Sequence, residues 1–157
     1  MGDALAVALS TGRGFEPVDF ARFHPGGSLG RRLVTRVADV MHKTALPICR
    51  PDAPFRDLVR IMTAGRLGLA LVMDGELLCG IVTDGDLRRV LDREDNPMML
   101  FAQEMMTKDP KTITPTLRFA EAEELMQTEK ITALVVVDEG EKVLGVLQLY
   151  DMGVGRK

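Results

Sequence analysis

The chain contains an internal repeat, and this feature constrains its fold more than any other. Asp39-Val40-Met41 returns as Glu104-Met105-Met106, and Gly80-Ile81-Val82 returns as Gly145-Val146-Leu147. Both pairs are offset by 65 residues, so two units of similar length follow one another. A unit of about 60 residues buries too little surface to be stable alone. We therefore expect the two units to pack face to face around a shared core.

The first unit shows the pattern of a β-α-β-β-α motif. Pro54 suits the start of a helix because its missing N–H is not needed there. The residues after it form one buried helical stripe, consisting of Phe55, Leu58, Val59 and Met62, and Gly65 helps to end the helix. Extended segments are expected at residues 47–49, 69–73 and 77–83, and a second helix starts near residue 84.

The second unit repeats this pattern. Extended segments are expected at residues 112–114, 133–137 and 143–149, and a helix over residues 117–128 turns Phe119, Ala122 and Met126 inward. Asn96-Pro97 favours a turn, so residues 92–101 are expected to connect the units. The predicted fold class is α+β, with two β-α-β-β-α units as a pseudo-twofold pair. The expected divisions are 1–36, a mainly helical and loop extension, 37–95, the first unit, and 96–157, the second unit.

Composition and charge exclude several classes of function. Lys and Arg number 20 against 23 Asp and Glu, so the net charge of −3 provides no basic field for nucleic acid or acidic membranes. Apolar runs are too short to span a bilayer and no signal-peptide pattern opens the chain, which predicts a cytoplasmic protein. Cys49 and Cys79 lack a CxxC spacing, and we expect no metal site.

An unusual polar cluster follows the third extended segment of the first unit. The string Gly80-Ile81-Val82-Thr83-Asp84-Gly85-Asp86 runs from an apolar strand into two carboxylates and a hydroxyl, and Arg88 and Arg89 come one turn later. The simpler interpretation is that Thr83 or Asp84 caps the next helix, which would contribute about 1 kcal/mol. Helix capping explains the presence of one of these polar residues. A ligand site explains the two acids together with both arginines.

This string resembles the signature of a cystathionine-β-synthase-type (CBS) domain, Gly-h-h-Thr-x-x-Asp, where h is apolar. The two units together resemble a Bateman module, which is a tandem CBS pair. The resemblance implies a cleft at the shared interface, with Asp86 accepting from ribose hydroxyls and Thr83 and the helix start facing phosphate. It also implies a wall around the base. That wall would contain Thr44, Ala45, Leu46, Leu69 and Ala70, with Thr132 closing the cleft from the second unit.

The second copy departs from this signature. Gln148 replaces the threonine, Tyr150 replaces the glycine, and Asp151 alone remains. We therefore expect an asymmetric module with one competent site, in the first unit.

The first 36 residues resemble the end of another domain. GDALAVAL and DFARFHPGGSLGRRL are similar to the tail of the sugar-isomerase (SIS) domain of D-arabinose 5-phosphate isomerases, and His24 matches that family's active-site histidine. The resemblance implies that only the end of the catalytic domain is present. A lone loop histidine provides neither a held substrate nor a positioned base, so we expect no catalytic activity from this chain.

The resemblance implies a regulatory role beside the SIS catalytic domain of a parent isomerase. No cofactor is expected to be required. The expected ligand is an adenine nucleotide, AMP or ATP, or CMP-Kdo, the activated end product of the parent pathway, in which the isomerase provides the first committed input to Kdo for lipopolysaccharide or capsule. The alternative is a ligand-free CBS pair that holds isomerase subunits together as a homodimer.

Overall fold

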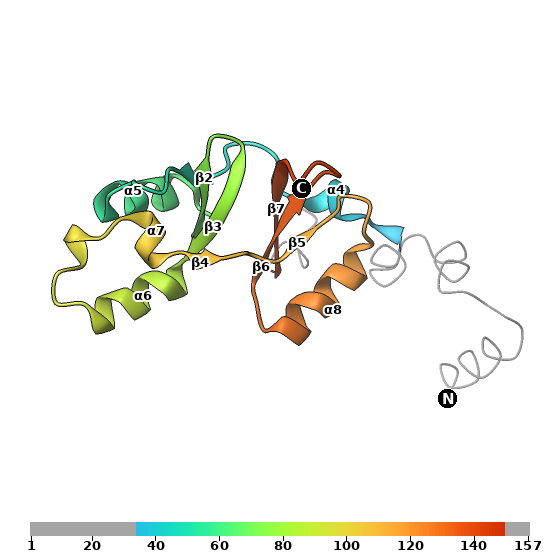
Figure 1. Ribbon diagram of the computed structural model, residues 1–157. Helices are drawn as coiled ribbons and strands as arrows, with labels where there is room; N and C mark the ends of the chain where they lie inside the picture. Colours follow the sequence, from blue (N-terminus) through green and yellow to red (C-terminus); the bar gives the residue numbers. More distant parts are fainter. Residues whose placement is uncertain (1–33, 150–157) are drawn as a thin grey trace, which may run out of the picture.

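The computed structural model describes residues 34–149, which form two small sheets with helices outside them (Figure 1). His24 and the expected last helix of the second unit lie outside the described residues. The helices are α4 (Val37–Val40), α5 (Phe55–Gly65), α6 (Asp84–Arg93), the 3-10 turn η1 (Pro97–Met99), α7 (Ala102–Met105) and α8 (Phe119–Glu129). The strands are β1 (Ile48–Cys49), β2 (Leu69–Asp74), β3 (Leu77–Thr83), β4 (Thr107–Lys108), β5 (Thr112–Ile113), β6 (Ala133–Val137) and β7 (Val143–Gln148).

The first unit has the predicted order β1, α5, β2, β3, α6. Helix α5 begins directly after Pro54, and three of the four residues of the predicted stripe, Phe55, Leu58 and Met62, are buried. Val59 is half-buried beside them. The amphipathic pattern therefore identified the face by which α5 packs on its sheet.

Helix α5 ends at Gly65, as expected. The residue with left-handed backbone is Arg66, with φ of 56°, while Gly65 is the last helical residue. A Cβ atom at Gly65 would lie 2.7 Å from the Cβ atom of Pro47. Glycine is needed here because the helix passes close to the segment before β1, and not because the backbone requires positive φ.

The second unit repeats the order with β5, α8, β6 and β7. Phe119, Ala122 and Met126 are buried, as predicted. Helix α8 begins two residues later than expected, because Arg118 has extended backbone and its N–H donates to Glu121 Oε2 at 3.0 Å. The connection between the units is also shorter than expected, since α6 continues to Arg93.

The two sheets pack face to face and carry their helices on the outer faces. Their strand orders are β1-β2-β3-β4 and β5-β6-β7. Successive residues of β2 point to opposite sides. Leu69, Leu71 and Met73 enter the core between the sheets, together with Val135 and Val146, whereas Ala70 and Val72 enter the core under α5. Burial on both faces explains the uninterrupted apolar sequence of this strand.

Each unit completes its outer core with a short helix from the other unit. Ala102 and Met105 of α7 pack into the core that contains Phe55 and Leu58 of the first unit. Val37 of α4 packs in return into the core of α8. The backbone follows the same exchange, because β4 pairs with β3 and His42 pairs with Val146 of β7. The two cores therefore depend on both halves of the chain.

Shortening Met105 should destabilise the whole molecule. Met105 is 5% exposed, so Met105→Ala leaves a cavity in the first core, at a cost of about 2–5 kcal/mol. Urea unfolding followed by circular dichroism should show one transition at a lower midpoint. Met99→Ala, at a residue that is 72% exposed, is the control and should change the midpoint little. Two separate transitions would contradict the mutual dependence of the units.

Candidate functional site

The strand-to-helix turn of the first unit is organised by Thr83 and Asp86. Thr83 is the N-cap of α6, and its hydroxyl accepts from the Asp86 N–H at 3.3 Å. In return, Asp86 Oδ2 accepts from the Thr83 N–H at 2.8 Å and from the Thr83 hydroxyl at 2.6 Å. This reciprocal arrangement is a capping box, which satisfies backbone donors at the start of the helix.

The second carboxylate oxygen of Asp86 holds two further groups together. Arg89 Nη2 donates to Asp86 Oδ1 at 2.6 Å, and Thr107 Oγ1 of β4 donates to the same oxygen at 3.4 Å. Asp86 is 7% exposed and is the buried charged residue among those described. An ionised carboxylate has about four acceptor positions, and all are used here. Asp86 therefore joins the end of β3, helix α6 and strand β4. We call α7 and β4, which come from the second unit and pack on the first, the exchanged segment.

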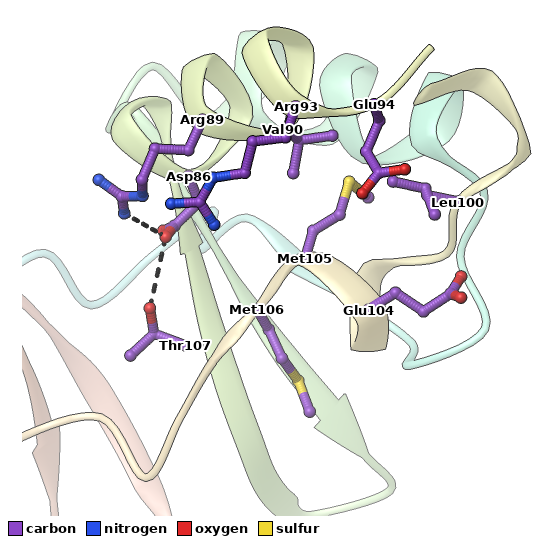
Figure 2. A pocket seen from close by; sticks show the side chains of 10 residues that line it. All are labelled: Asp86, Arg89, Val90, Arg93, Glu94, Leu100, Glu104, Met105, Met106 and Thr107. Carbon is purple, nitrogen blue, oxygen red and sulfur yellow. Dashed lines mark hydrogen bonds and ion pairs between the residues drawn. The ribbon is translucent and has the colours of Figure 1, made fainter. Parts of the chain in front are cut away.

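A cavity of about 360 Å³ extends from this carboxylate between α6 and the segment that carries α7 (Figure 2). Its lining includes two arginines, three acids and an apolar floor. The lining residues are Asp86, Arg89, Val90, Arg93, Glu94, Leu100, Glu104, Met105, Met106 and Thr107. The volume is within the range of small-molecule sites, roughly 300–1,000 Å³.

The other predicted binding residues of the first unit do not line this cavity. Asp84 and Arg88 are exposed, and the Asp84 N–H donates to the Gly68 carbonyl at 2.9 Å. Leu69 pairs with Thr83 across the sheet, but its side chain is buried between the sheets. Ala70 is buried in the core under α5. Of the predicted binding residues, Asp86 and Arg89 border the cavity.

Most of the residues predicted to surround the nucleotide base and not yet described lie in one segment, which runs from the second sheet to the first. His42 is paired with β7 of the second sheet, and the Pro47 carbonyl accepts from the Leu71 N–H of the first sheet at 2.8 Å. Between them, Thr44 and Ala45 are exposed and Leu46 is half-buried against the core between the sheets. Thr132 is exposed, and its carbonyl accepts from the Leu149 N–H.

Sequence reasoning missed the residues that the exchanged segment contributes. Thr107, Met105 and Met106 follow the connection, so their position beside α6 depends on the packing of α7 into the first unit. The repeat contained a clue to the role of Thr107, because Thr107 occupies the position in the second unit that His42 occupies in the first. Arg93 was also missed. It lies seven residues after Asp86, and this spacing places both on one face of α6.

The described residues contain no group of three or more His, Cys, Asp or Glu side chains that could hold a metal ion. Cys49 and Cys79 are both free thiols. Burial raises the pKa of Cys49 to about 11, so this thiol stays protonated at neutral pH. Within residues 34–149, no helix is long and apolar enough to cross a membrane.

The matching position of the second unit is built differently. Gln148, which replaces the threonine, donates through its side-chain amide to the Leu67 carbonyl of the first unit. Leu67 immediately precedes Gly68, whose carbonyl holds the start of α6. The second copy thus provides a contact between the units where the first copy has a capping box.

Within residues 34–149, a β-α-β-β-α unit and a second unit with the order β-α-β-β share a sheet-to-sheet core, and the first carries an acidic strand-to-helix turn. These features define a paired α+β module. The model of the CBS domain matches the chain twice, over residues 37–93 and 102–152. The chain therefore belongs to the CBS-domain family, as its signature string indicated.

Curated relatives are isomerases of about twice the length. The chain is 46% identical over 152 residues to arabinose 5-phosphate isomerase KpsF of Escherichia coli, covering 96% of this chain and 46% of that protein. It is 48% identical over 149 residues to a probable arabinose 5-phosphate isomerase of Haemophilus influenzae, covering 94% and 44%. The chain thus spans about half the length of these relatives.

Solved structures of CBS proteins share the fold. The CBS domain protein PAE2072 from Pyrobaculum aerophilum, complexed with AMP, superposes with a TM-score of 0.68 at 24% identity, covering 78% of this chain and 93% of that one. The CBS domain pair of protein MJ0100, in complex with 5'-methylthioadenosine and S-adenosyl-L-methionine, gives 0.68 at 21% identity, covering 75% and 92%. At these identities the likeness concerns the fold.

Removing the cap of α6 should lower stability measurably. Thr83→Ala deletes the hydroxyl that bonds with both the amide and the carboxylate of Asp86, so we expect a loss of about 1 kcal/mol. Thr63→Ala is the control, because the Thr63 hydroxyl is exposed and bonds only within α5. Chemical unfolding of both variants measures the difference. Equal stability of the two variants would show that the Thr83 hydroxyl contributes nothing to the stability of the fold.

Proposed function

We propose that this chain is the regulatory CBS pair of a cytoplasmic arabinose 5-phosphate isomerase and that it binds a nucleotide or nucleotide sugar at Asp86. The similarity to two isomerases over nearly the whole chain supports the parent activity. The solved CBS structures that bind adenine nucleotides or related adenosine compounds support the ligand class. The SIS catalytic domain of the parent isomerase is then the partner that receives the signal.

The observation that carries the proposal is a buried carboxylate at the end of a cavity. Asp86 presents an acceptor oxygen that suits a ribose hydroxyl, and Arg89 beside it suits a phosphate. The bond from Thr107, at 3.4 Å, is the longest at this carboxylate, so a ribose hydroxyl would take its place. These groups hold a ligand and do not supply a positioned base for isomerisation, so the proposed chemistry is binding.

Two ligands fit the proposal on different grounds. AMP is bound by a CBS protein of the same fold. CMP-Kdo fits as the activated end product of the pathway that the parent would supply, since end-product sensing controls flux at its entry. Regulation needs a different affinity of the ligand for two states of the parent enzyme.

Titration calorimetry of the chain with CMP-Kdo, CMP, AMP and ATP tests this function. We expect saturable binding of at least one nucleotide. Asp86→Asn should weaken it by about tenfold or more, because a charged acceptor of ribose hydroxyls is lost. Asp92→Asn is the matched control, since Asp92 is exposed on the same helix and does not line the cavity. Absence of heat with all four nucleotides, from folded protein, would reject the binding function.

A second candidate is an assembly element that binds no ligand. The segment from Leu91 to Phe101 favours it, because it exposes large apolar side chains outside the intramolecular cores. Their exposed fractions are 56% for Leu91, 55% for Met98, 72% for Met99 and 42% for Phe101.

Sedimentation velocity distinguishes this role. If the apolar segment holds two copies together, the wild-type chain sediments as a dimer and Met99→Glu sediments as a monomer, because a charge would be buried at the contact. The control, Arg56→Gln on exposed α5 surface, should remain dimeric. A monomeric wild-type chain would exclude assembly through this segment.

A further inference from the structure

Arg93 is a cationic side chain of the cavity that neither the capping box nor the proposed ribose contact uses. It lies in the last turn of α6, and Figure 2 shows its side chain turned into the cavity beneath the helix. Arg89 is held by Asp86 at 2.6 Å. Within residues 34–149, no hydrogen bond or ion pair holds Arg93. Its guanidinium donors are therefore open to a ligand.

The spacing along α6 sets what such a ligand must look like. Asp86, Arg89 and Arg93 lie at positions i, i+3 and i+7, which form one stripe of the helix. At 1.5 Å per residue, the backbone positions of Asp86 and Arg93 are about 10 Å apart. A ribose at Asp86 would place its own phosphate near Arg89. The Arg93 side chain turns back along the helix toward Asp86 and Arg89 in Figure 2, so its guanidinium would meet an acidic group that the ligand carries next to this first phosphate.

The acidic residues on the opposite side of the cavity determine where a negatively charged group of the ligand would bind. Glu94 and Glu104 repel an anion, and Glu104 Oε2 is fixed by the Phe101 N–H at 2.8 Å. Their carboxylates accept from sugar hydroxyls instead. Met105 and Met106 provide a polarisable apolar floor for the body of the ligand. The acidic group is therefore directed to Arg93, where a guanidinium offers two donors to a carboxylate or phosphate.

We propose that Arg93 selects nucleotides that carry a second acidic group next to the first phosphate, either a further phosphate or the carboxylate of a sugar acid. This inference rests on the proposed nucleotide binding at Asp86 and specifies the class of ligand. Nucleoside monophosphates occupy the Asp86 end of the cavity alone, and their affinity does not depend on Arg93.

Paired titrations measure this selection. AMP is compared with ADP, and CMP with CMP-Kdo, on the full chain and on Arg93→Gln, Arg88→Gln and Arg56→Gln. The wild-type chain should bind one or both of ADP and CMP-Kdo about tenfold or more tightly than the matching monophosphate, as expected for a charge-assisted contact. Arg93→Gln should lose this preference and keep the affinity for AMP and CMP within about twofold. Arg56→Gln, remote from the cavity, should behave as wild type.

The outcomes separate this inference from the function on which it rests. If no nucleotide binds the wild-type chain, both fail. If nucleotides bind and Arg93→Gln keeps the preference, or the wild-type chain shows none, nucleotide binding stands and the role of Arg93 is overturned. Loss of the preference in Arg88→Gln instead would assign the second acidic group to Arg88. Because Arg93 is exposed, its substitution leaves the fold intact, and thermal unfolding verifies this.

Discussion

The packing of the two sheets against each other, with an exchanged helix on each outer face, is the constraint on which the rest of the molecule depends. Leu69, Leu71 and Val146 fill the space between the sheets, and Met105 and Val37 complete cores that belong to the opposite unit. A unit of this size buries so little surface that it is marginally stable by itself. Sharing three cores between two units solves this problem, and it places segments distant in the sequence beside the start of α6.

Asp86 shows how this packing creates a site. A buried carboxylate is costly unless its charge and lone pairs are satisfied. The capping box with Thr83 satisfies one oxygen within the first unit, while Arg89 and Thr107 satisfy the other. Thr107 reaches Asp86 because β4 pairs with β3 after the exchange. The same carboxylate thus stabilises the helix start and borders a cavity whose far wall comes from the second half of the chain. Capping and ligand binding are compatible uses of Asp86.

The sequence was most informative where structure is local. The repeat, the buried stripe of α5 and the strand positions were predicted because helix and strand periodicity is recorded in neighbouring residues. Element ends were less accurate. Helix α8 begins two residues later than predicted. Helix α5 does end at Gly65, but the lack of a side chain there is required by the distant Pro47. The site shows the same contrast between local and distant contacts. Thr83, Asp86 and Arg89 are close in sequence, and hydrogen bonds join them. The wall around the base stays a prediction for all of its residues, Thr44, Ala45, Leu46, Leu69, Ala70 and Thr132.

The sequence by itself determined that the chain holds two repeated units with the order β-α-β-β, that their longer strands are buried, and that one unit carries the acidic turn of the CBS signature while the other departs from it. Tertiary structure alone decided that α7 and β4 join the first unit, and hence that Thr107, Met105 and Met106 meet α6 at a cavity. The reason is physical. Periodicity reports which face of an element is apolar, but a short apolar helix fits either core, and only the joint packing of both sheets selects its partner.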